Sequence, residues 1–341
     1  MLSTHVVSRT TVLLTRKGAL MSTRSLTPSP SARRLGRSGV WRSLLALIFV
    51  ALVLTGGGVA KAQYTTLDDP SADPVQGTNI VGINNQGQMV GEYWDSTSHI
   101  YGFLLNNGVY TTLDVPNAVF GAYAAGINNQ GLIVGTYFDN TQLSHGFLLS
   151  QGVYTTLDDP NATAEVGYGN TFASGINDKG QIVGYYFDSA GGAHGFLLSQ
   201  GVYTTLDDPN AGSGTYALGI NNQGQIVGTY FDSAGGAHGF LLNKGVYTTL
   251  DDPNAGSSIY GSGTLAGGIN DKGQIVGQYY DSTGGVYGFL LSKGVYTTLH
   301  DPNAVAEAGL GTYAAGINNQ GLIVGGYLDS NGAENGFLLI P

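Results

Sequence analysis

Aspartates that recur at one position of the sequence are the residues best placed to do chemistry. One Asp follows a Tyr and a second apolar or aromatic residue in every copy of a repeated phrase. Carboxylates are the hard oxygen ligands that Ca²⁺ prefers, so a calcium site is one hypothesis. The alternative, that each Asp opens a turn or caps a strand end, is favoured because no D-x-[DN]-x-[DN]-G loop is present. The candidate metal ligands are Asp95, Asp139, Asp188, Asp232, Asp281 and Asp329, and doublets before Pro add Asp68-Asp69, Asp158-Asp159, Asp207-Asp208 and Asp251-Asp252.

Aromatic residues between the copies are the second set of candidates. Tyr amid Gly, Ser and Asn is a composition used by adaptable binding surfaces, and rings at a strand end offer stacking platforms for sugars. The Tyr and aromatic pair before each Asp is instead expected to pack against neighbouring sheets. We place the candidate rings in loops between repeats, with one at a strand end. The candidate ligand-binding residues are Tyr123, Tyr168, Phe172, Tyr216, Tyr260, Tyr313 and Trp94.

Histidine recurs at one position in three copies, where it is expected to begin a strand and to be structural. The other copies carry Tyr or Asn there, which disfavours chemistry that needs His in every copy. Polar residues that repeat without a single odd nucleophile and base favour binding over catalysis. A polysaccharide-active hydrolase or lyase, or a purely structural extracellular protein, is the alternative. The histidines are His145, His194 and His238, and their replacements are Tyr101, Tyr287 and Asn335.

These residues belong to a unit that the chain repeats. The phrase G-I-N-N-Q-G-Q-I-V-G occupies residues 219–228, and near-copies begin at Gly82, Gly126, Gly175, Gly268 and Gly316. From the Gly of G-I-N to the Phe of G-F-L-L the offset is 21 in all six copies, whereas the connection from Y-T-T-L to the next G-I-N varies from 16 to 21. One part of the unit is therefore rigid, and the length variation falls in one connection.

Each unit contains four short runs rich in β-branched and aromatic residues, which predict four strands. The runs are A-x-G-I-N, I-V-G-x-Y-F, H-G-F-L-L and V-Y-T-T-L, and N-x-x-G, D-S-x-G-G and N-K-G turns separate them. Apolar residues on both faces require cover from neighbouring sheets. The sequence therefore predicts an all-β fold, a six-bladed β-propeller of four-stranded antiparallel blades. A parallel β-helix is disfavoured because its coils are shorter than these units of about 46 residues.

The two ends of the repeat region complement one another. Residues 64–67 read Y-T-T-L without a preceding G-F-L-L, and G-F-L-L at residues 336–339 has no Y-T-T-L after it. We expect the N-terminal strand to pair with the last blade and close the ring, which removes an exposed edge. Because turns of a meander alternate between two ends, the D-S-x-G-G turns and the variable connections share one face. Recognition is expected on that face.

The segment before residue 63 differs from the rest of the chain. It holds nine of the thirteen Lys and Arg residues and no acidic residue, and an apolar run at 44–54 leads to a small-x-small site ending at Ala62. We interpret residues 1–62 as a signal peptide with an N-terminal extension, cleaved before the propeller at 63–341. Met21 is an alternative start, and a retained membrane anchor is disfavoured because the run is short. The predicted location is extracellular or periplasmic.

Charge excludes some functions of the mature chain. Residues 63–341 carry all 23 acidic residues and four lysines, so the formal charge is 4 − 23 = −19. Such a surface repels nucleic acid and anionic lipid, and no Arg is present after residue 62 to clamp phosphate. There is no cysteine, so stability must come from packing. We expect a soluble monomer without membrane insertion after cleavage, whose partner is an extracellular glycan or a protein.

The whole mature chain resembles the HAF family of extracellular bacterial repeat proteins. That family carries a His-Ala-Phe tripeptide after a G-I-N-x-x-G-x-x-V-G segment, and the tripeptide here reads His-Gly-Phe at His145, His194 and His238. The resemblance implies export and a repeat-built β-fold. It implies no particular activity.

Overall fold

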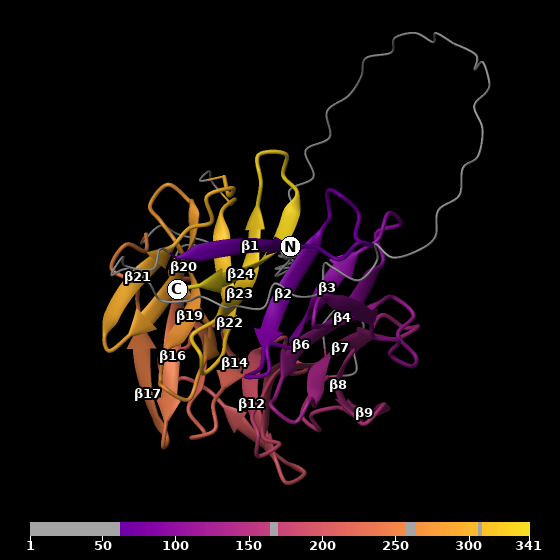
Figure 1. Ribbon diagram of the computed structural model, residues 1–341. Helices are drawn as coiled ribbons and strands as arrows, with labels where there is room; N and C mark the ends of the chain where they lie inside the picture. Colours follow the sequence, from indigo (N-terminus) through magenta and orange to yellow (C-terminus); the bar gives the residue numbers. More distant parts are fainter. Residues whose placement is uncertain (1–61, 164–169, 257–262, 306–308) are drawn as a thin grey trace, which may run out of the picture. The chain divides into compact units, whose positions relative to one another are not determined.

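The computed structural model describes residues 62–341 except 164–169, 257–262 and 306–308, and this part of the chain is built from strands and turns (Figure 1). The predicted leader at 1–62 therefore lies almost entirely outside the described residues. Within them, no helix has the length and hydropathy that crossing a bilayer requires.

The strands form six consecutive antiparallel meanders, as predicted for the blades of a propeller. Blade 1 contains β2 (Thr78–Ile83), β3 (Met89–Trp94), β4 (Ile100–Asn106) and β5 (Val109–Thr112). Blade 2 contains β6 (Ala122–Ile127), β7 (Ile133–Phe138), β8 (Ser144–Ser150) and β9 (Val153–Leu157). Blade 3 contains β10 (Thr171–Ile176), β11 (Ile182–Phe187), β12 (Ala193–Ser199) and β13 (Val202–Leu206).

Blades 4 to 6 repeat this order. Blade 4 contains β14 (Gly214–Ile220), β15 (Ile226–Phe231), β16 (Ala237–Asn243) and β17 (Val246–Leu250). Blade 5 contains β18 (Gly263–Ile269), β19 (Ile275–Tyr280), β20 (Val286–Ser292) and β21 (Val295–Leu299). Blade 6 contains β22 (Thr312–Ile317), β23 (Ile323–Leu328), β24 (Glu334–Ile340) and, from the other end of the repeat region, β1 (Gln63–Leu67).

The hairpins follow the turn chemistry that the sequence predicts. In blade 4, Lys244 and Gly245 link the third and fourth strands with φ values of 51° and 81°, the left-handed pair that a tight two-residue hairpin requires. In the turn between second and third strands, Gly235 has a φ of 87°, whereas Ser98 and Gln142 adopt φ values of 62° and 68° in the blades that lack Gly there. Short strands joined by such turns position the same side chains in every blade.

The last blade is closed by the N-terminal strand. Tyr64 pairs with Leu339 in an antiparallel register that runs along all of β1, and Figure 1 shows β1 and β24 side by side. The Tyr64 ring packs edge-on against Phe337 at 5.4 Å. The Thr66 hydroxyl lies 3.0 Å from the Tyr327 hydroxyl. The predicted closure is therefore confirmed.

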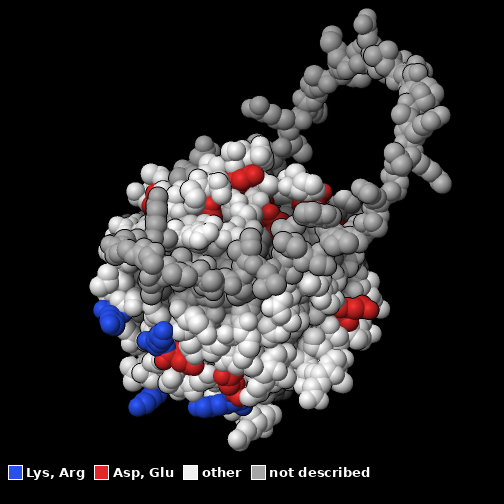
Figure 2. All heavy atoms as spheres, viewed as in Figure 1, with Lys and Arg blue, Asp and Glu red and all other residues white. Residues whose placement is uncertain are grey.

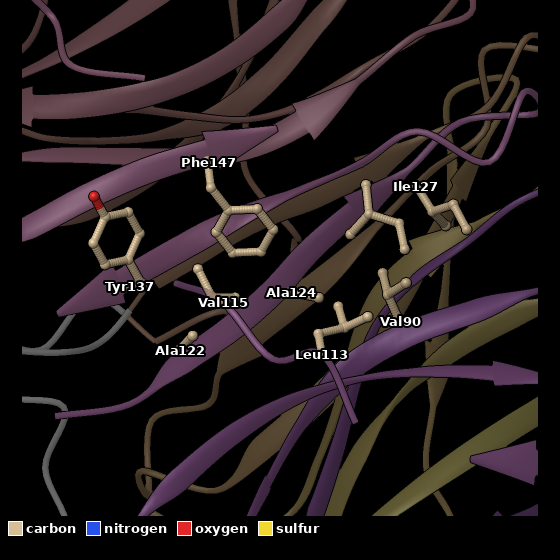
Figure 3. Close-up of a cluster of buried hydrophobic side chains, with 9 residues drawn as sticks. Val90, Leu113, Val115, Ala122, Ala124, Ile127, Tyr137 and Phe147 are labelled. Atoms are coloured by element: carbon tan, nitrogen blue, oxygen red, sulfur yellow. The ribbon is translucent and has the colours of Figure 1, made fainter. Parts of the chain in front are cut away.

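The core lies between blades. Figure 3 shows the cluster that Val90 and Leu113 of blade 1 form with Ala124, Tyr137 and Phe147 of blade 2. Phe147 is 1% exposed, and its counterparts in all blades are similarly buried. A side chain at Gly135 would lie 2.1 Å from a backbone oxygen and 2.8 Å from the Phe147 ring, so only glycine fits there. Val324 of blade 6 joins the cluster of blade 1, which completes the ring of blades.

Candidate functional site

The aspartates of the D-S-x-G-G turns hold their own turns together. Asp188 Oδ1 accepts hydrogen bonds from the backbone N–H groups of Ala190 at 2.9 Å and Gly192 at 2.8 Å. These bonds, led by the one from Gly192, hold the pKa of Asp188 below its usual range. The Asx-turn interpretation is confirmed for all six positions. The same pattern recurs at Asp95, Asp139, Asp232, Asp281 and Asp329.

The six aspartates do not come together as a metal centre. Each belongs to a different blade and binds backbone amides of its own turn. Among the residues that the structure describes, no group of three or more His, Cys, Asp or Glu side chains is arranged to hold a metal ion. The calcium hypothesis for these positions stays a prediction.

Instead, three turn aspartates each face a histidine of the same blade. The His194 Nδ1 lies 2.9 Å from Asp207 Oδ1, and its Nε2 lies 3.4 Å from Asp188 Oδ2. One carboxylate comes from the D-S-x-G-G turn and the other from the end of the fourth strand. We call these groups the Asp-His-Asp triplets, and they are Asp139-His145-Asp158, Asp188-His194-Asp207 and Asp232-His238-Asp251.

Strand register places each imidazole on a tyrosine ring. Tyr186 pairs with His194 across β11 and β12, and the two rings stack with centroids 5.2 Å apart. The Tyr186 hydroxyl lies 3.1 Å from the hydroxyl of Thr205, which belongs to β13. Burial lowers the pKa of His194, but its hydrogen bonds and charge interactions with Asp207 and Asp188 outweigh this and raise the pKa above its ordinary value. His194 therefore holds a proton more readily than an isolated histidine does.

The other three blades keep the position and change the chemistry. Tyr101 stacks on Tyr93 at 5.3 Å and Tyr287 on Tyr279 at 5.5 Å, so tyrosine occupies the place of histidine without altering the packing. Asn335 takes this position in blade 6. His300 stands where other blades carry the first Asp of the doublet, with its ring 5.6 Å from Tyr287. The sequence analysis treated His145, His194 and His238 as structural and did not predict the carboxylates beside them. The register of the hairpin between the third and fourth strands would have placed these carboxylates.

The second aspartate of each doublet is buried and caps the turn before Pro. The backbone N–H of Asp208 donates to the Thr215 hydroxyl at 3.0 Å, and its Oδ1 accepts from Asn210 N–H at 2.9 Å. Asp208 is 3% exposed. Burial raises the pKa of its counterparts Asp159 and Asp301. The capping role predicted for these residues is confirmed, and they leave the first Asp of the doublet to face solvent and histidine.

The predicted loop position of the aromatic candidates is wrong for four of them. Each lies within the innermost strand of its blade, because pairing with the second strand extends upstream of G-I-N. Tyr216, for example, pairs with Thr229 across β14 and β15. The four are Tyr123 in β6, Phe172 in β10, Tyr216 in β14 and Tyr313 in β22. Tyr168 and Tyr260 lie outside the described residues, and Trp94 ends β3 as a half-buried side chain.

Blades 3 and 4 bring several of these rings into one aromatic cluster. Phe172 stacks on Tyr185 at 4.6 Å, and Tyr185 meets Tyr216 of the next blade edge-on at 4.9 Å. Phe187 and Phe231 extend the cluster at the ends of β11 and β15. Phe187 and Phe231 end the strands that lead into the D-S-x-G-G turns, and Phe172 pairs with Tyr185 near the same end of the blade. The cluster and two of the triplets therefore belong to the same face of the same blades.

The opposite face holds a polar feature that the sequence reading missed. The first Asn of each N-N-Q-G turn is buried, and Asn221 Nδ2 donates to the backbone oxygen of Asn270 in the next blade at 3.1 Å. The bond recurs between all neighbouring blades, so six bonds form a closed inner ring around the axis. Its members are Asn84, Asn128, Asn177, Asn221, Asn270 and Asn318.

A second ring forms from the residues that follow. Each backbone N–H donates at 2.8 Å to the Oδ1 of the equivalent residue in the next blade, and the ring also closes. Asn222 donates through Nδ2 to both of its neighbours, Asp178 at 2.8 Å and Asp271 at 2.9 Å. The two rings line an axial opening of about 100 Å³. The outer ring comprises Asn85, Asn129, Asp178, Asn222, Asp271 and Asn319.

Comparisons with known proteins extend only to solved structures. No protein-family model matches the chain, and no curated protein matches it. The six-bladed β-propeller lectin of Aleuria aurantia, described with a fucose recognition mode, is similar at TM-score 0.48 and 13% identity over 76% of this chain and 90% of that chain. AofleA of Arthrobotrys oligospora is similar at 0.47 and 11% over 83% and 84%. TolB of Acinetobacter baumannii is similar at 0.49 and 13% over 74% and 63%. The assignment of this chain as a six-bladed propeller follows from its own strand pairing.

Proposed function

We propose that this protein is a secreted, non-enzymatic binding module that recognises an extracellular glycan through the face carrying the D-S-x-G-G turns. The observation that carries the proposal is the Asp-His-Asp triplet, which three consecutive blades present at equivalent positions. Export and membership of the HAF family belong to the same proposal.

The chemistry of this face suits sugar hydroxyls. Carboxylate oxygens accept hydrogen bonds from sugar hydroxyl groups, and the imidazole, whose two ring nitrogens face Asp188 and Asp207, holds these carboxylates in place. Asp207 is about half exposed beside His194, so the acceptor is reachable from solvent. The aromatic cluster of Phe172, Tyr185 and Tyr216 supplies apolar ring surface on the same blades. Few polar groups placed beside aromatic surface are typical of small-ligand sites.

Charge selects the class of glycan. The four lysines of the described residues all lie in N-x-x-G or x-x-G turns on the opposite face. Figure 2 shows the basic side chains low in the view with some acidic ones beside them, whereas the top of the view carries acidic side chains alone. A face with carboxylates and no fixed cation repels sulfated and uronic-acid polymers. We therefore propose a neutral, hydroxyl-rich glycan. Three equivalent sites on one face allow multivalent binding to a repeating polymer.

The first test replaces histidine by the tyrosine that two blades already carry. The triple variant His145→Tyr, His194→Tyr, His238→Tyr is expected to fold normally, because Tyr101 and Tyr287 pack in the same way. On a glycan array the wild-type mature protein should bind neutral glycans, and the triple variant should lose at least about 90% of that signal. Far-ultraviolet circular dichroism and the melting temperature check the fold. Equal binding by a folded triple variant would refute the site.

The reverse substitution sharpens the test. Tyr101→His would create a fourth triplet in blade 1, because Asp95 and Asp114 occupy the two carboxylate positions. It should strengthen binding to a polymeric glycan by avidity and leave binding to a monosaccharide per site unchanged. Tyr287→His is the matched control, since His300 stands in place of the second carboxylate.

Two further assays test the alternatives to this proposal. Binding measured with and without Ca²⁺ tests the metal hypothesis, and release of reducing ends from a polysaccharide would identify an enzyme.

A further inference from the structure

A cavity of about 450 Å³ lies between blades 5 and 6, on the face of the N-N-Q-G turns. Its volume falls in the range of about 300–1,000 Å³ that small-molecule sites occupy. One wall carries Lys272 and Lys293 with the amide of Gln274 and the hydroxyl of Ser292. The other wall carries Leu322, Ile340 and Pro341, with Leu290 between the walls. The cavity is separate from the triplets, which occupy the opposite face.

The residues that line this groove differ from those at the same repeat positions in other blades. The position of Leu322 is Gln in four of the six repeats, and the positions of Ile340 and Pro341 are polar in every other repeat. The position of Lys272 is Gln in four repeats. Only the groove between blades 5 and 6 combines two lysines on one wall with three apolar residues on the other. This combination of residues distinguishes the groove between blades 5 and 6 from the equivalent grooves.

The two lysines bring positive charge to the cavity. Among the described residues, neither Lys272 nor Lys293 forms an ion pair. The neighbouring carboxylate of Asp271 is turned toward the axis, where its oxygens accept from Asn222 and Asn319. Two ammonium groups that line one cavity without an ion-paired carboxylate favour an anion.

We propose that this cavity binds a small amphipathic anion, with a carboxylate or sulfonate head on Lys272 and Lys293 and an apolar chain or ring against Leu322 and Ile340. Ser292 and Gln274 supply further hydrogen bonds to the head group. A solvated pair of lysines alone binds an anion weakly. Burial of the apolar part of the ligand against Leu322 and Ile340 supplies the remaining affinity.

Isothermal titration of the mature protein with octanoate tests this site. Saturable binding of one equivalent is expected, whereas 1-octanol, which lacks the charge, and inorganic sulfate, which lacks the chain, should each bind at least about tenfold more weakly. The variant Lys272→Gln, Lys293→Gln carries the residue that other repeats use at both positions and should weaken octanoate at least about tenfold. Leu322→Gln, again a residue native to other repeats, should have a similar effect.

The matched control removes the same charge from the same face. Lys179→Gln, Lys244→Gln alters turns of blades 3 and 4 and should leave octanoate affinity within about twofold of the wild type. Melting temperatures establish that all variants fold. Equal loss in the control would show non-specific charge attraction and overturn the site, as would 1-octanol binding as tightly as octanoate. Absence of saturable octanoate binding to the wild type up to about 1 mM would also overturn it.

Discussion

The two faces of the propeller use polar side chains in opposite ways. On the N-N-Q-G face, Asn221 and Asn222 bond to residues of the neighbouring blades and complete two closed rings. On the D-S-x-G-G face, Asp188 and His194 bond within their own blade, and their side chains are 36% and 27% exposed. Asn221 holds its own turn through Oδ1 and bonds to the next blade through Nδ2. The triplets, in contrast, bond only within one blade and keep groups accessible to solvent.

Distance from the axis explains the difference. Innermost strands of all blades meet near the axis, so equivalent residues at their ends come within hydrogen-bonding reach of one another. The triplets lie on the second to fourth strands, further out, where equivalent residues of different blades diverge. The same repeated polar chemistry therefore joins blades near the axis and remains available to ligands farther from it.

The largest effect is expected from a substitution in the outer ring. Asn222→Asp removes two donors and places a third carboxylate between Asp178 and Asp271. We expect a loss of about 3 kcal/mol in the free energy of unfolding at pH 7, from lost charge-assisted hydrogen bonds and like-charge repulsion. The penalty should shrink as the pH falls below about 4, where carboxyl groups protonate. Urea denaturation at several pH values measures both.

Asn85→Asp is the control with the same charge change in the same ring. The neighbours of Asn85 are Asn129 and Asn319, each of which donates through Nδ2 to only one aspartate. A carboxylate at position 85 would alternate with amides around the ring, so stability should be unchanged or slightly increased. Equal destabilisation by both variants would show that charge alone, rather than the donor pattern, governs the ring.

A smaller effect is expected on the other face. Asp188→Asn weakens bonds confined to one solvent-exposed turn, so its melting temperature should fall by less than that of Asn222→Asp. Because the pKa of Asp188 is lowered by folding, its contribution is present above the unfolded-state pKa near 4 and is lost as the pH falls through the folded-state value. Wild type and variant should therefore converge in acid. A loss as large as that in the ring would contradict the contrast between faces.

The smallest effect concerns the charge on histidine. Folding raises the pKa of His194, so its contribution to stability is complete below the unfolded-state pKa near 6.5 and is lost as the pH rises through the folded-state value. We expect less than about 1 kcal/mol, because the triplet is partly exposed. His194→Tyr should abolish this part of the pH dependence. Nuclear magnetic resonance titration of the ring protons would detect a pKa that is not raised.

Sequence spacing predicted the frame of the molecule because constant offsets report strand and turn lengths directly. The 21-residue offset from Gly219 to Phe240 runs from the end of β14 through β15 into β16 and includes two turns, and it is the same in every blade. The unmatched Y-T-T-L at 64–67 predicted the partner of β24. Asp-His pairing was accessible in principle, since Gly195 pairs with Leu206 and so brings His194 beside Asp207. The spacing of turns did not predict the asparagine rings. Contacts between equivalent residues of neighbouring blades depend on how far these residues lie from the axis, and the sequence of one repeat does not give that distance.

The pairing of β1 with β24 has a consequence for how the protein is made. Thr66 and Tyr327, which meet in blade 6, are 261 positions apart in the chain. During synthesis β1 is made first and its partner β24 last, so β1 stays unpaired until the chain is complete. Contacts so distant in sequence slow the final folding step. During that interval the free edge of blade 6 can pair with the equivalent strand of another molecule. Crowded nascent chains would therefore yield strand-exchanged dimers, and dilution would yield monomers.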